Sequence, residues 1–412
     1  MPDTTTAQVI VGASLAGAKA AQTLRDEGFD GPVVLIGEES ERPYERPPLS
    51  KGYLLGSSDR ESVYVHPRGW YAEHDVDLRL NTRVSAIDPE RHHVTLADGG
   101  QIGYAKLLLT TGSSAHPLPV PGADLDGVLY LRRLQDSDRI KAALTSASRV
   151  VVIGGGWIGL ETAAAARAGD VEVTLLESAE LPLLGVLGRE AAQIFADLHR
   201  EHGVDLRLGV QVSEIVANQG RAVGVRMADG TRVDADVVIV GVGITPNITL
   251  AQDAGLDVGN GVRTDEHLRT SHPDIYAAGD VANAFHPLLN RQIRVEHWAN
   301  ALNQPQTAAK AMIGQDAVYD RLPYFFTDQY DLGMEYAGYL EPGDYDQVVF
   351  RGDLAKREFV AFWLAQGRVL AGMNVNVWDV NDAIQALVRS GQQIDQADLA
   401  DPDVPLEALL KS

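Results

Sequence analysis

Two short glycine-rich stretches, each between an apolar run and an alanine-rich segment, constrain the fold more than any other feature of this sequence. The first covers residues 12–17, the second covers residues 154–159, and further apolar runs follow at residues 33–36 and 171–176. An apolar strand, a tight glycine turn, a helix and a second strand make up the βαβ unit that binds a dinucleotide. The sequence therefore predicts an α/β protein with two Rossmann-like dinucleotide-binding domains.

The first turn departs from the usual pattern of three glycines. In that pattern the first glycine makes the turn, the second lets the backbone approach a pyrophosphate, and the third lets the helix pack on the strand. Gly12 and Gly17 hold the first and third positions, but Ser14 holds the second, followed by Leu15 and Ala16. A serine fits there if its hydroxyl points away from the phosphate or bonds to it. This turn is predicted to bind a dinucleotide cofactor.

A carboxylate follows each βαβ unit. Glu38 comes about 20 residues after the first turn, where a carboxylate binds the ribose hydroxyls of an adenosine. Glu177 holds the same place in the second unit, and no arginine or lysine lies near it in the sequence. A 2′-phosphate would meet this carboxylate without a cation to neutralise it. We therefore expect the second unit to prefer NADH over NADPH.

The second turn has all three glycines, and we expect it to bind NAD through Gly154, Gly156, Ile158 and Gly159. The chain has no cysteine, so thiol nucleophiles, disulfide exchange and cysteine-ligated iron–sulfur clusters are excluded. Redox chemistry would then belong to bound cofactors. Two dinucleotide units in one such chain point to non-covalent FAD in the first and NADH in the second, without a metal.

Length and charge narrow the class of protein further. A chain of 412 residues is longer than one hydrophobic core usually serves, so several domains are expected. The formal charge of −22 argues against nucleic acid or an anionic membrane surface as a partner. We find no run of about 18 apolar residues, and the first residues are polar. A cytoplasmic protein is the expectation.

Four further segments carry a resemblance to a known family. Residues 270–282 contain a Gly-Asp turn, residues 107–112 and 238–247 have the pattern of crossovers between two dinucleotide domains, and residues 42–51 read RPYERPPLSK. Together with the glycine turns, they resemble the two-dinucleotide-domain flavoprotein reductases. The RPPLSK loop is similar to that of the FAD-dependent NADH:ferredoxin reductase family, whose members serve Rieske dioxygenases and haem-thiolate monooxygenases. Monodehydroascorbate reductase and apoptosis-inducing factor share parts of this loop.

The resemblance implies further cofactor contacts. Those to FAD are Arg46, Lys51, Val84, Thr111, Gly112, Arg132, Asp280 and Trp298, and one to NAD is Gly243. Arg133 could take the part of Arg132, and Trp298 could be an ordinary core residue instead of a ring that stacks on the flavin.

The resemblance also implies that Lys51 lies beside the flavin and pairs with Glu161. Lysine would stabilise the reduced flavin, and glutamate would accept the nicotinamide carboxamide. A plain buried ion pair is the alternative. Hydride transfer needs no acid or base from the protein, so His297 receives no role.

The expected domains are a discontinuous FAD-binding domain (1–112 and 241–321), an NAD-binding domain (113–240) and a small C-terminal α+β domain (322–412). The last domain is predicted from short alternating strands followed by a helix at residues 379–389. Its opening, residues 326–330, resembles the FWSDQY segment of the reductases, but it lacks the redox cysteine of disulfide reductases. The chain is expected to be a monomer or a weak dimer.

The resemblance implies an enzyme that oxidises NADH by hydride transfer to flavin N5 and passes single electrons to a [2Fe-2S] ferredoxin, which feeds a monooxygenase or dioxygenase. Ferredoxins are acidic, so binding one to this acidic chain would require a local basic face. The alternative is that the surface arginines and lysines are scattered and form no docking face. Candidates are Arg68, Arg291, Arg294, Arg351, Lys356, Arg357 and Arg368. The alternatives are NADH-dependent reduction of a quinone, a radical or dioxygen, and an NADH-sensing flavoprotein.

Overall fold

The fold was analysed in a computed structural model that describes residues 6–410. Contacts within the chain define two compact units. The first unit contains the residues up to Glu45, Arg60–Ser114 and Ile244–Pro323, and the second contains Arg46–Asp59, Ala115–Gly243 and the residues from Tyr324 onward. The RPPLSK loop and the C-terminal segment therefore belong to the same compact unit as the second glycine turn. The division into three domains with the boundaries given above stays a prediction.

The first unit is built on a parallel sheet in the order β20-β7-β1-β2-β3. Its central strands are apolar and buried on both faces, which is typical of parallel sheets covered by helices. The strands are β1 (Gln8–Val11), β2 (Val33–Ile36), β3 (Val76–Arg79), β7 (Lys106–Leu109) and β20 (Ile275–Ala277). Helix α1 (Leu15–Asp26) packs against α8 (Trp298–Met312).

Smaller elements complete the first unit. An antiparallel sheet contains β4 (Val84–Asp88), β5 (His93–Leu96) and β6 (Gln101–Gly103). A second small sheet contains β18 (Val258–Gly259), β19 (Gly261–Thr264), β21 (Ala282–His286) and β22 (Arg291–Arg294). The remaining elements are α3 (Trp70–Glu73), α7 (Thr249–Asp253), β17 (Ile244–Pro246) with its partner β8 (Ser113–Ala115), and the 3₁₀ turns η3 (Arg60–Val63) and η4 (Gly279–Val281).

The second unit has its own parallel sheet in the order β12-β11-β10-β16-β9. Its strands are β9 (Val128–Tyr130), β10 (Arg149–Ile153), β11 (Glu172–Glu177), β12 (Asp205–Leu208) and β16 (Val237–Val240). The helices are α4 (Leu134–Ser146), α5 (Trp157–Ala168) and α6 (Leu184–Glu201), which is interrupted at Gly188 (φ 74°). An antiparallel sheet of β13 (Val212–Asn218), β14 (Arg221–Met227) and β15 (Arg232–Asp234) is attached.

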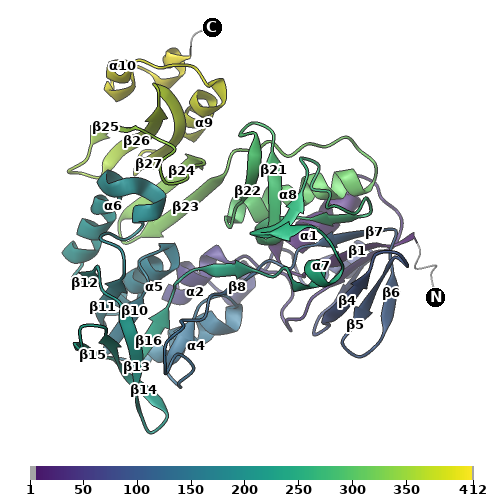
Figure 1. The fold of residues 1–412 in the computed structure, drawn as a ribbon, viewed down its shortest axis with the longest axis horizontal. Helices are drawn as coiled ribbons and strands as arrows, with labels where there is room; N and C mark the ends of the chain where they lie inside the picture. Colours follow the sequence, from purple (N-terminus) through teal and green to yellow (C-terminus); the bar gives the residue numbers. More distant parts are fainter. Residues whose placement is uncertain (1–5, 411–412) are drawn as a thin grey trace. The chain divides into compact units, whose positions relative to one another are not determined.

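The C-terminal part of the second unit is an antiparallel sheet in the order β23-β24-β27-β26-β25 (Figure 1). Its strands are β23 (Tyr324–Gln329), β24 (Leu332–Gly338), β25 (Gln347–Asp353), β26 (Glu358–Ala365) and β27 (Arg368–Val375). Helix α9 (Asn381–Ser390) packs on β24 and β27, and α10 (Gln396–Ala400) and the turn η5 (Leu406–Leu409) follow. The RPPLSK loop forms the turn η2 (Pro47–Ser50) and the short helix α2 (Gly52–Leu55).

The two parallel sheets confirm the predicted fold class. In the C-terminal sheet, β24 to β27 cover the sequence's alternating runs at residues 333–338, 347–351, 359–364 and 368–374. Among residues 6–410, no helix is both long enough and apolar enough to cross a membrane.

Candidate functional site

Four connections meet at the carboxyl end of the first unit's parallel sheet. The register places Val11 level with Ile36 and Leu109, and Leu109 level with Ala277. The residues that follow these strand ends are the first glycine turn, Glu38, the stretch 110–112 and Asp280. Ligands of open α/β sheets bind outside the carboxyl ends of the strands. The fold therefore brings most of the predicted FAD residues of this unit to one edge.

The first turn tolerates no side chain at its two glycines. A Cβ at Gly12 would lie 2.1 Å from the Thr110 carbonyl oxygen, and Gly12 has a φ of +123°. A Cβ at Gly17 would lie 2.1 Å from the Gly12 carbonyl oxygen. Ser14 precedes α1 in an extended conformation, and its hydroxyl does not cap the helix. The first turn of α1 has no acidic residue, so no carboxylate would compete with an anion at the positive end of the helix dipole.

Packing against this turn positions Glu38 and Asp280. A Cβ at Gly37 would lie 2.5 Å from the Ala13 Cβ, so the chain just before Glu38 passes directly against the turn. Gly279 approaches α1 in the same way, since a Cβ at Gly279 would lie 3.2 Å from the Ala16 Cβ. The Glu38 side chain is exposed, whereas Asp280 is buried. The residues that carry both carboxylates therefore follow backbone that packs against the glycine turn.

The threonines after β7 connect the crossovers. The Thr110 hydroxyl donates to the Gly12 carbonyl at 2.8 Å. Thr111 donates to the Asn247 carbonyl at 2.9 Å, and the Asn247 amide returns a hydrogen bond to the Thr111 carbonyl at 2.8 Å. The predicted Thr111 and Gly112 therefore belong to a paired segment next to the glycine turn.

Trp298 and Val84 occupy different surroundings in the first unit. Trp298 is the first residue of α8 and lies beside Glu45, whose pKa is raised by burial. Val84 is buried at the start of β4 within the apolar core. The contacts of both residues with a flavin stay predictions.

The second glycine turn is built like the first but has an open middle position. A Cβ at Gly154 would lie 2.3 Å from the Gly241 carbonyl oxygen, and one at Gly159 would lie 1.9 Å from the Gly154 carbonyl oxygen. At Gly156, by contrast, no heavy atom lies within 4 Å of the Cβ position. Gly243, which follows β16, is equally open. Ile158, in the first turn of α5, is 39% exposed. The open backbone at Gly156 fits the close approach of a pyrophosphate.

Glu177 is held against this turn by hydrogen bonds. Its Oε2 accepts from the Gly155 N–H at 2.5 Å, and its Oε1 accepts from the Ala179 N–H at 2.7 Å. The Ser178 hydroxyl donates to Oε1 at 3.1 Å. The negative charge is thus fixed at the end of β11 beside the glycine turn.

The second unit also brings Lys51 and Glu161 together. Lys51 Nζ lies 2.7 Å from Glu161 Oε1, and the Glu161 side chain is only 4% exposed. The Thr327 hydroxyl donates to the same oxygen at 2.6 Å, and the Ser50 hydroxyl donates to Oε2. A buried carboxylate of this kind is tolerated because three donors, one of them positively charged, compensate its desolvation.

Sequence reasoning missed two of these donors. Ser50 is the serine of the RPPLSK loop, and Thr327 stands in the segment at 326–330, so both were inside recognised motifs without a role. Thr327 is fully buried on β23, and a polar side chain that is buried on a strand requires a partner. That was the available signal.

The remaining loop residues contact α4 in the second unit. An Arg46 guanidinium nitrogen donates to the Arg132 carbonyl, and the Ser137 hydroxyl donates to the Leu49 carbonyl at 2.8 Å. The backbone N–H groups of Arg132 and Arg133 both donate to the Asp136 carboxylate. The Arg133 side chain, just before α4, is exposed. Arg46 and Arg132 are therefore neighbours, and their role toward FAD stays a prediction.

Three of the seven candidate cations for a docking face already pair with carboxylates. Arg294 pairs with Glu296, Lys356 pairs with Asp353 at 3.1 Å, and Arg357 pairs with Glu201. Arg351 donates to the Val404 carbonyl at 2.6 Å. These contacts reduce the positive charge that is free to attract a partner.

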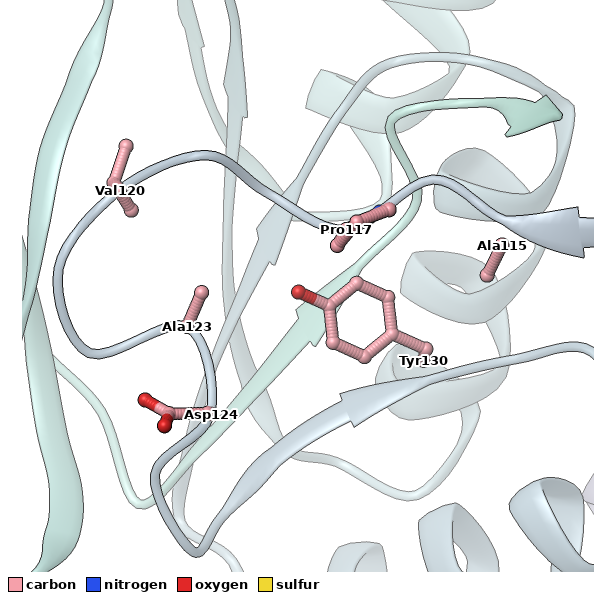
Figure 2. A pocket seen from close by; sticks show the side chains of 6 residues that line it. All are labelled: Ala115, Pro117, Val120, Ala123, Asp124 and Tyr130. Atoms are coloured by element: carbon pink, nitrogen blue, oxygen red, sulfur yellow. The ribbon is translucent and has the colours of Figure 1, made fainter.

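A surface pocket in the second unit contains none of the predicted residues. Figure 2 shows its lining side chains on the loop at 115–124 around the Tyr130 ring: Ala115, Pro117, Val120, Ala123, Asp124 and Tyr130. The Tyr130 hydroxyl accepts a hydrogen bond from the Leu118 N–H at 3.1 Å. Its lining is largely apolar, so this pocket differs in character from the two glycine turns.

Comparison with known proteins agrees with this geometry. Residues 6–305 match the family described as pyridine nucleotide-disulphide oxidoreductase, and residues 324–410 match the reductase C-terminal domain. The chain is similar to the 5,5'-dehydrodivanillate O-demethylase ferredoxin reductase subunit of a Sphingobium species, with 43% identity over 97% of each chain. It is also similar to putidaredoxin reductase of Pseudomonas putida, with 39% identity over 98% of this chain and 96% of the other.

A solved structure shows the same architecture over nearly the whole chain. The covalent putidaredoxin reductase–putidaredoxin complex contains a chain that matches with a TM-score of 0.94 and 38% identity, over 98% of both chains. Family match, sequence relatives and structure agree over the same residues. The chain therefore belongs to the pyridine nucleotide-disulphide oxidoreductase family, in the group whose members are FAD- and NAD(P)H-dependent ferredoxin reductases.

Proposed function

We propose that this protein is an NADH-dependent ferredoxin reductase of an oxygenase system. One turnover would convert NADH and two oxidised ferredoxins into NAD⁺, two reduced ferredoxins and one proton, which balances electrons and charge. The observation that carries the proposal is the presence of two glycine turns, each built for a dinucleotide, in one chain without cysteine. Relatives named ferredoxin reductases support the choice of acceptor.

The first unit would hold FAD. Gly12, Ser14 and Gly17 would accept the pyrophosphate at the start of α1, Glu38 would bind the adenosine ribose, and Asp280 would bind the ribityl chain. FAD, when bound, supplies a ring that accepts two electrons together and releases them one at a time. The packing of Gly37 and Gly279 against the turn supports this assignment, because it keeps both carboxylates beside the phosphate position.

The second unit would hold NADH rather than NADPH. Gly156 leaves space for the pyrophosphate, and Glu177 would accept the hydroxyls of the adenosine ribose. The Gly155 and Ala179 N–H groups fix the Glu177 carboxylate, so it would not turn away from a 2′-phosphate without losing both hydrogen bonds. Repulsion between the Glu177 carboxylate and a 2′-phosphate would therefore disfavour NADPH.

The Lys51–Glu161 pair would serve the reacting rings. Glu161 would accept a hydrogen bond from the nicotinamide carboxamide, and Lys51 would place a positive charge where negative charge develops during reduction. The pair is buried and held by hydrogen bonds from Ser50 and Thr327, which would orient it toward the reacting rings. The chemistry requires no proton acceptor from the chain.

The absence of cysteine excludes a disulfide of this chain as the electron acceptor. Disulfide reductases of this family pass electrons to a cysteine pair of their own, which this chain cannot form. Electrons must therefore leave to a separate molecule. The relatives named ferredoxin reductases favour a redox protein over a quinone or dioxygen.

Anaerobic stopped-flow spectroscopy tests the proposal. The yellow protein is mixed with NADH and then with a [2Fe-2S] ferredoxin, and in parallel with a quinone. We expect rapid bleaching of the flavin and fast ferredoxin reduction. Bleaching followed by transfer only to the quinone would refute the acceptor, and absence of bleaching would refute the NADH assignment.

A further inference from the structure

A chain of buried hydrogen bonds runs from Glu161 to helix α6 inside the second unit. The Thr327 hydroxyl donates to Glu161 at 2.6 Å, Gln329 Nε2 donates to the Thr327 hydroxyl at 3.2 Å, and Gln329 Oε1 lies 2.9 Å from His199 Nε2. The Tyr330 hydroxyl lies 3.3 Å from His199 Nδ1. Thr327, Gln329 and His199 are each at most 1% exposed. We refer to Thr327, Gln329, His199 and Tyr330 as the polar chain.

The polar chain has one direction of donation. Because Gln329 turns its oxygen toward His199, His199 must donate from Nε2. Burial lowers the pKa of His199 to about 4, so the ring is neutral near pH 7 and its Nδ1 is a free acceptor for Tyr330. Each member therefore donates toward Glu161. Hydrogen bonds aligned in this way polarise one another and strengthen the bond at the charged end.

The outer end of the polar chain lies in the hairpin turn between β23 and β24. Gln329 pairs with Leu332, so Tyr330 is the first of two turn residues, and its φ of 56° is positive, as the favoured two-residue hairpin turns require. Its ring stacks on His202 with 3.7 Å between ring centres and an interplanar angle of 11°. This stacking holds the Tyr330 side chain against α6, with its hydroxyl 3.3 Å from His199 Nδ1.

We propose that His199 and Gln329 are positioning residues for Glu161: by donating in sequence, they turn the Thr327 hydroxyl toward the carboxylate and so fix the face that Glu161 offers to the nicotinamide. This inference rests on the proposed NADH site. It assigns a role to helix α6 and strand β23, neither of which contains a residue of the two glycine turns. Without the donation from Gln329, the Thr327 hydroxyl is free to rotate to another acceptor.

Substitutions at His199 separate this role from plain packing. His199→Gln keeps a donor near Nε2, whereas His199→Phe keeps bulk and removes the donor. Thr327→Val and Gln329→Met interrupt the polar chain at nearly unchanged volume, and they serve if the phenylalanine variant does not fold. Trp363→Phe is the matched control, because it removes another buried hydrogen bond to α6, from Trp363 Nε1 to the Leu187 carbonyl at 3.0 Å.

The measured quantities are the dissociation constant of NAD⁺ from the oxidised protein and the thermal midpoint. We expect weaker binding by about tenfold for Thr327→Val and about threefold for His199→Phe, with His199→Gln close to the parent protein. In a Glu161→Gln background, His199→Phe should cause no further change, since His199 acts through that carboxylate. Trp363→Phe should lower the thermal midpoint without changing the NAD⁺ dissociation constant.

Three results would overturn the inference. They are equal NAD⁺ affinity in His199→Phe and the parent protein, an undiminished His199→Phe effect in the Glu161→Gln background, and a Trp363→Phe effect on NAD⁺ binding as large as that of His199→Phe. If the parent protein does not bind NAD⁺, the proposed function is refuted, but the polar chain is not yet tested.

The polar chain is then tested by the carboxyl ¹³C resonance of Glu161, identified by its loss in Glu161→Gln. It should shift in Thr327→Val and His199→Phe but not in Trp363→Phe, and an unmoved resonance refutes the inference.

Discussion

The two outer positions of the second glycine turn and its middle position should respond differently to the same small substitution. Gly156→Ala places a methyl group where no heavy atom lies within 4 Å, and the backbone there (φ −80°, ψ 179°) suits alanine. We expect the free energy of unfolding to change by no more than about 1 kcal/mol, because the loss of a good helix cap opposes the reduced freedom of the unfolded chain.

Gly159→Ala places its methyl group 1.9 Å from the Gly154 carbonyl oxygen. The overlap is with backbone, so no side-chain rotation relieves it, and we expect a loss of roughly 3 kcal/mol or more. Gly156→Ala should instead weaken NADH binding, by about tenfold or more, since the methyl group stands where the pyrophosphate would approach.

Thermal unfolding and an NADH titration of the same preparations separate the two effects. Gly156→Ala should keep a thermal midpoint within a few degrees of the parent protein and lose NADH affinity. Gly159→Ala should lose thermal stability first. If Gly156→Ala binds NADH as tightly as the parent protein, the pyrophosphate does not approach this turn and the assignment of the second unit is wrong.

Three further predictions concern single side chains. Glu177→Gln should raise kcat/KM for NADPH by about tenfold, because it removes the charge that faces a 2′-phosphate. Steady-state kinetics with both nucleotides tests this, and an unchanged ratio of kcat/KM for NADH to that for NADPH would contradict it. Lys51→Met should lower the midpoint potential of bound FAD by roughly 30 mV, equivalent to about 1.4 kcal/mol for two electrons, because it removes a positive charge beside the flavin. Lys51→Arg keeps the charge and should leave the potential unchanged. Equal potentials for Lys51→Met and the parent protein in spectroelectrochemistry would speak against the role of Lys51. His199, whose pKa is lowered to about 4 from 6.5 by burial, binds a proton more readily in the unfolded chain, so stability should fall as the pH drops from 6.5 toward 4. Burial lowers the pKa of His66 and His297 to about 4 as well, so His199→Gln should reduce the slope of the thermal midpoint against pH without abolishing it, and an unchanged slope would show that His199 does not contribute.

Local patterns in the sequence were sufficient for the glycine turns. Strand, turn and helix are contiguous, and each glycine is required by atoms close in the same unit, such as the Gly12 carbonyl against Gly17. The family resemblance then paired Lys51 with Glu161, and the structure contains that pair. Burial of Glu161 among three donors agrees with the expected site but is also compatible with a plain buried ion pair, so its role toward the nicotinamide remains proposed.

The donors to Glu161 could not be read from the sequence. Ser50 and Thr327 are 111 and 166 positions away from Glu161, and Gln329 is 130 positions from His199. Hydroxyl and amide partners at such separations depend on tertiary packing, which no local period encodes. Element ends were also displaced: the C-terminal helix was expected at residues 379–389 but covers Asn381–Ser390, because Asp379 has a φ of 62° and cannot begin a right-handed helix.

The most direct test of the central claim is the rate at which the NADH-reduced protein reduces a [2Fe-2S] ferredoxin in the absence of oxygen. We expect two ferredoxins to be reduced for each NADH consumed, at a rate well above that of NADPH-driven reduction. Consumption of NADH without ferredoxin reduction would contradict it.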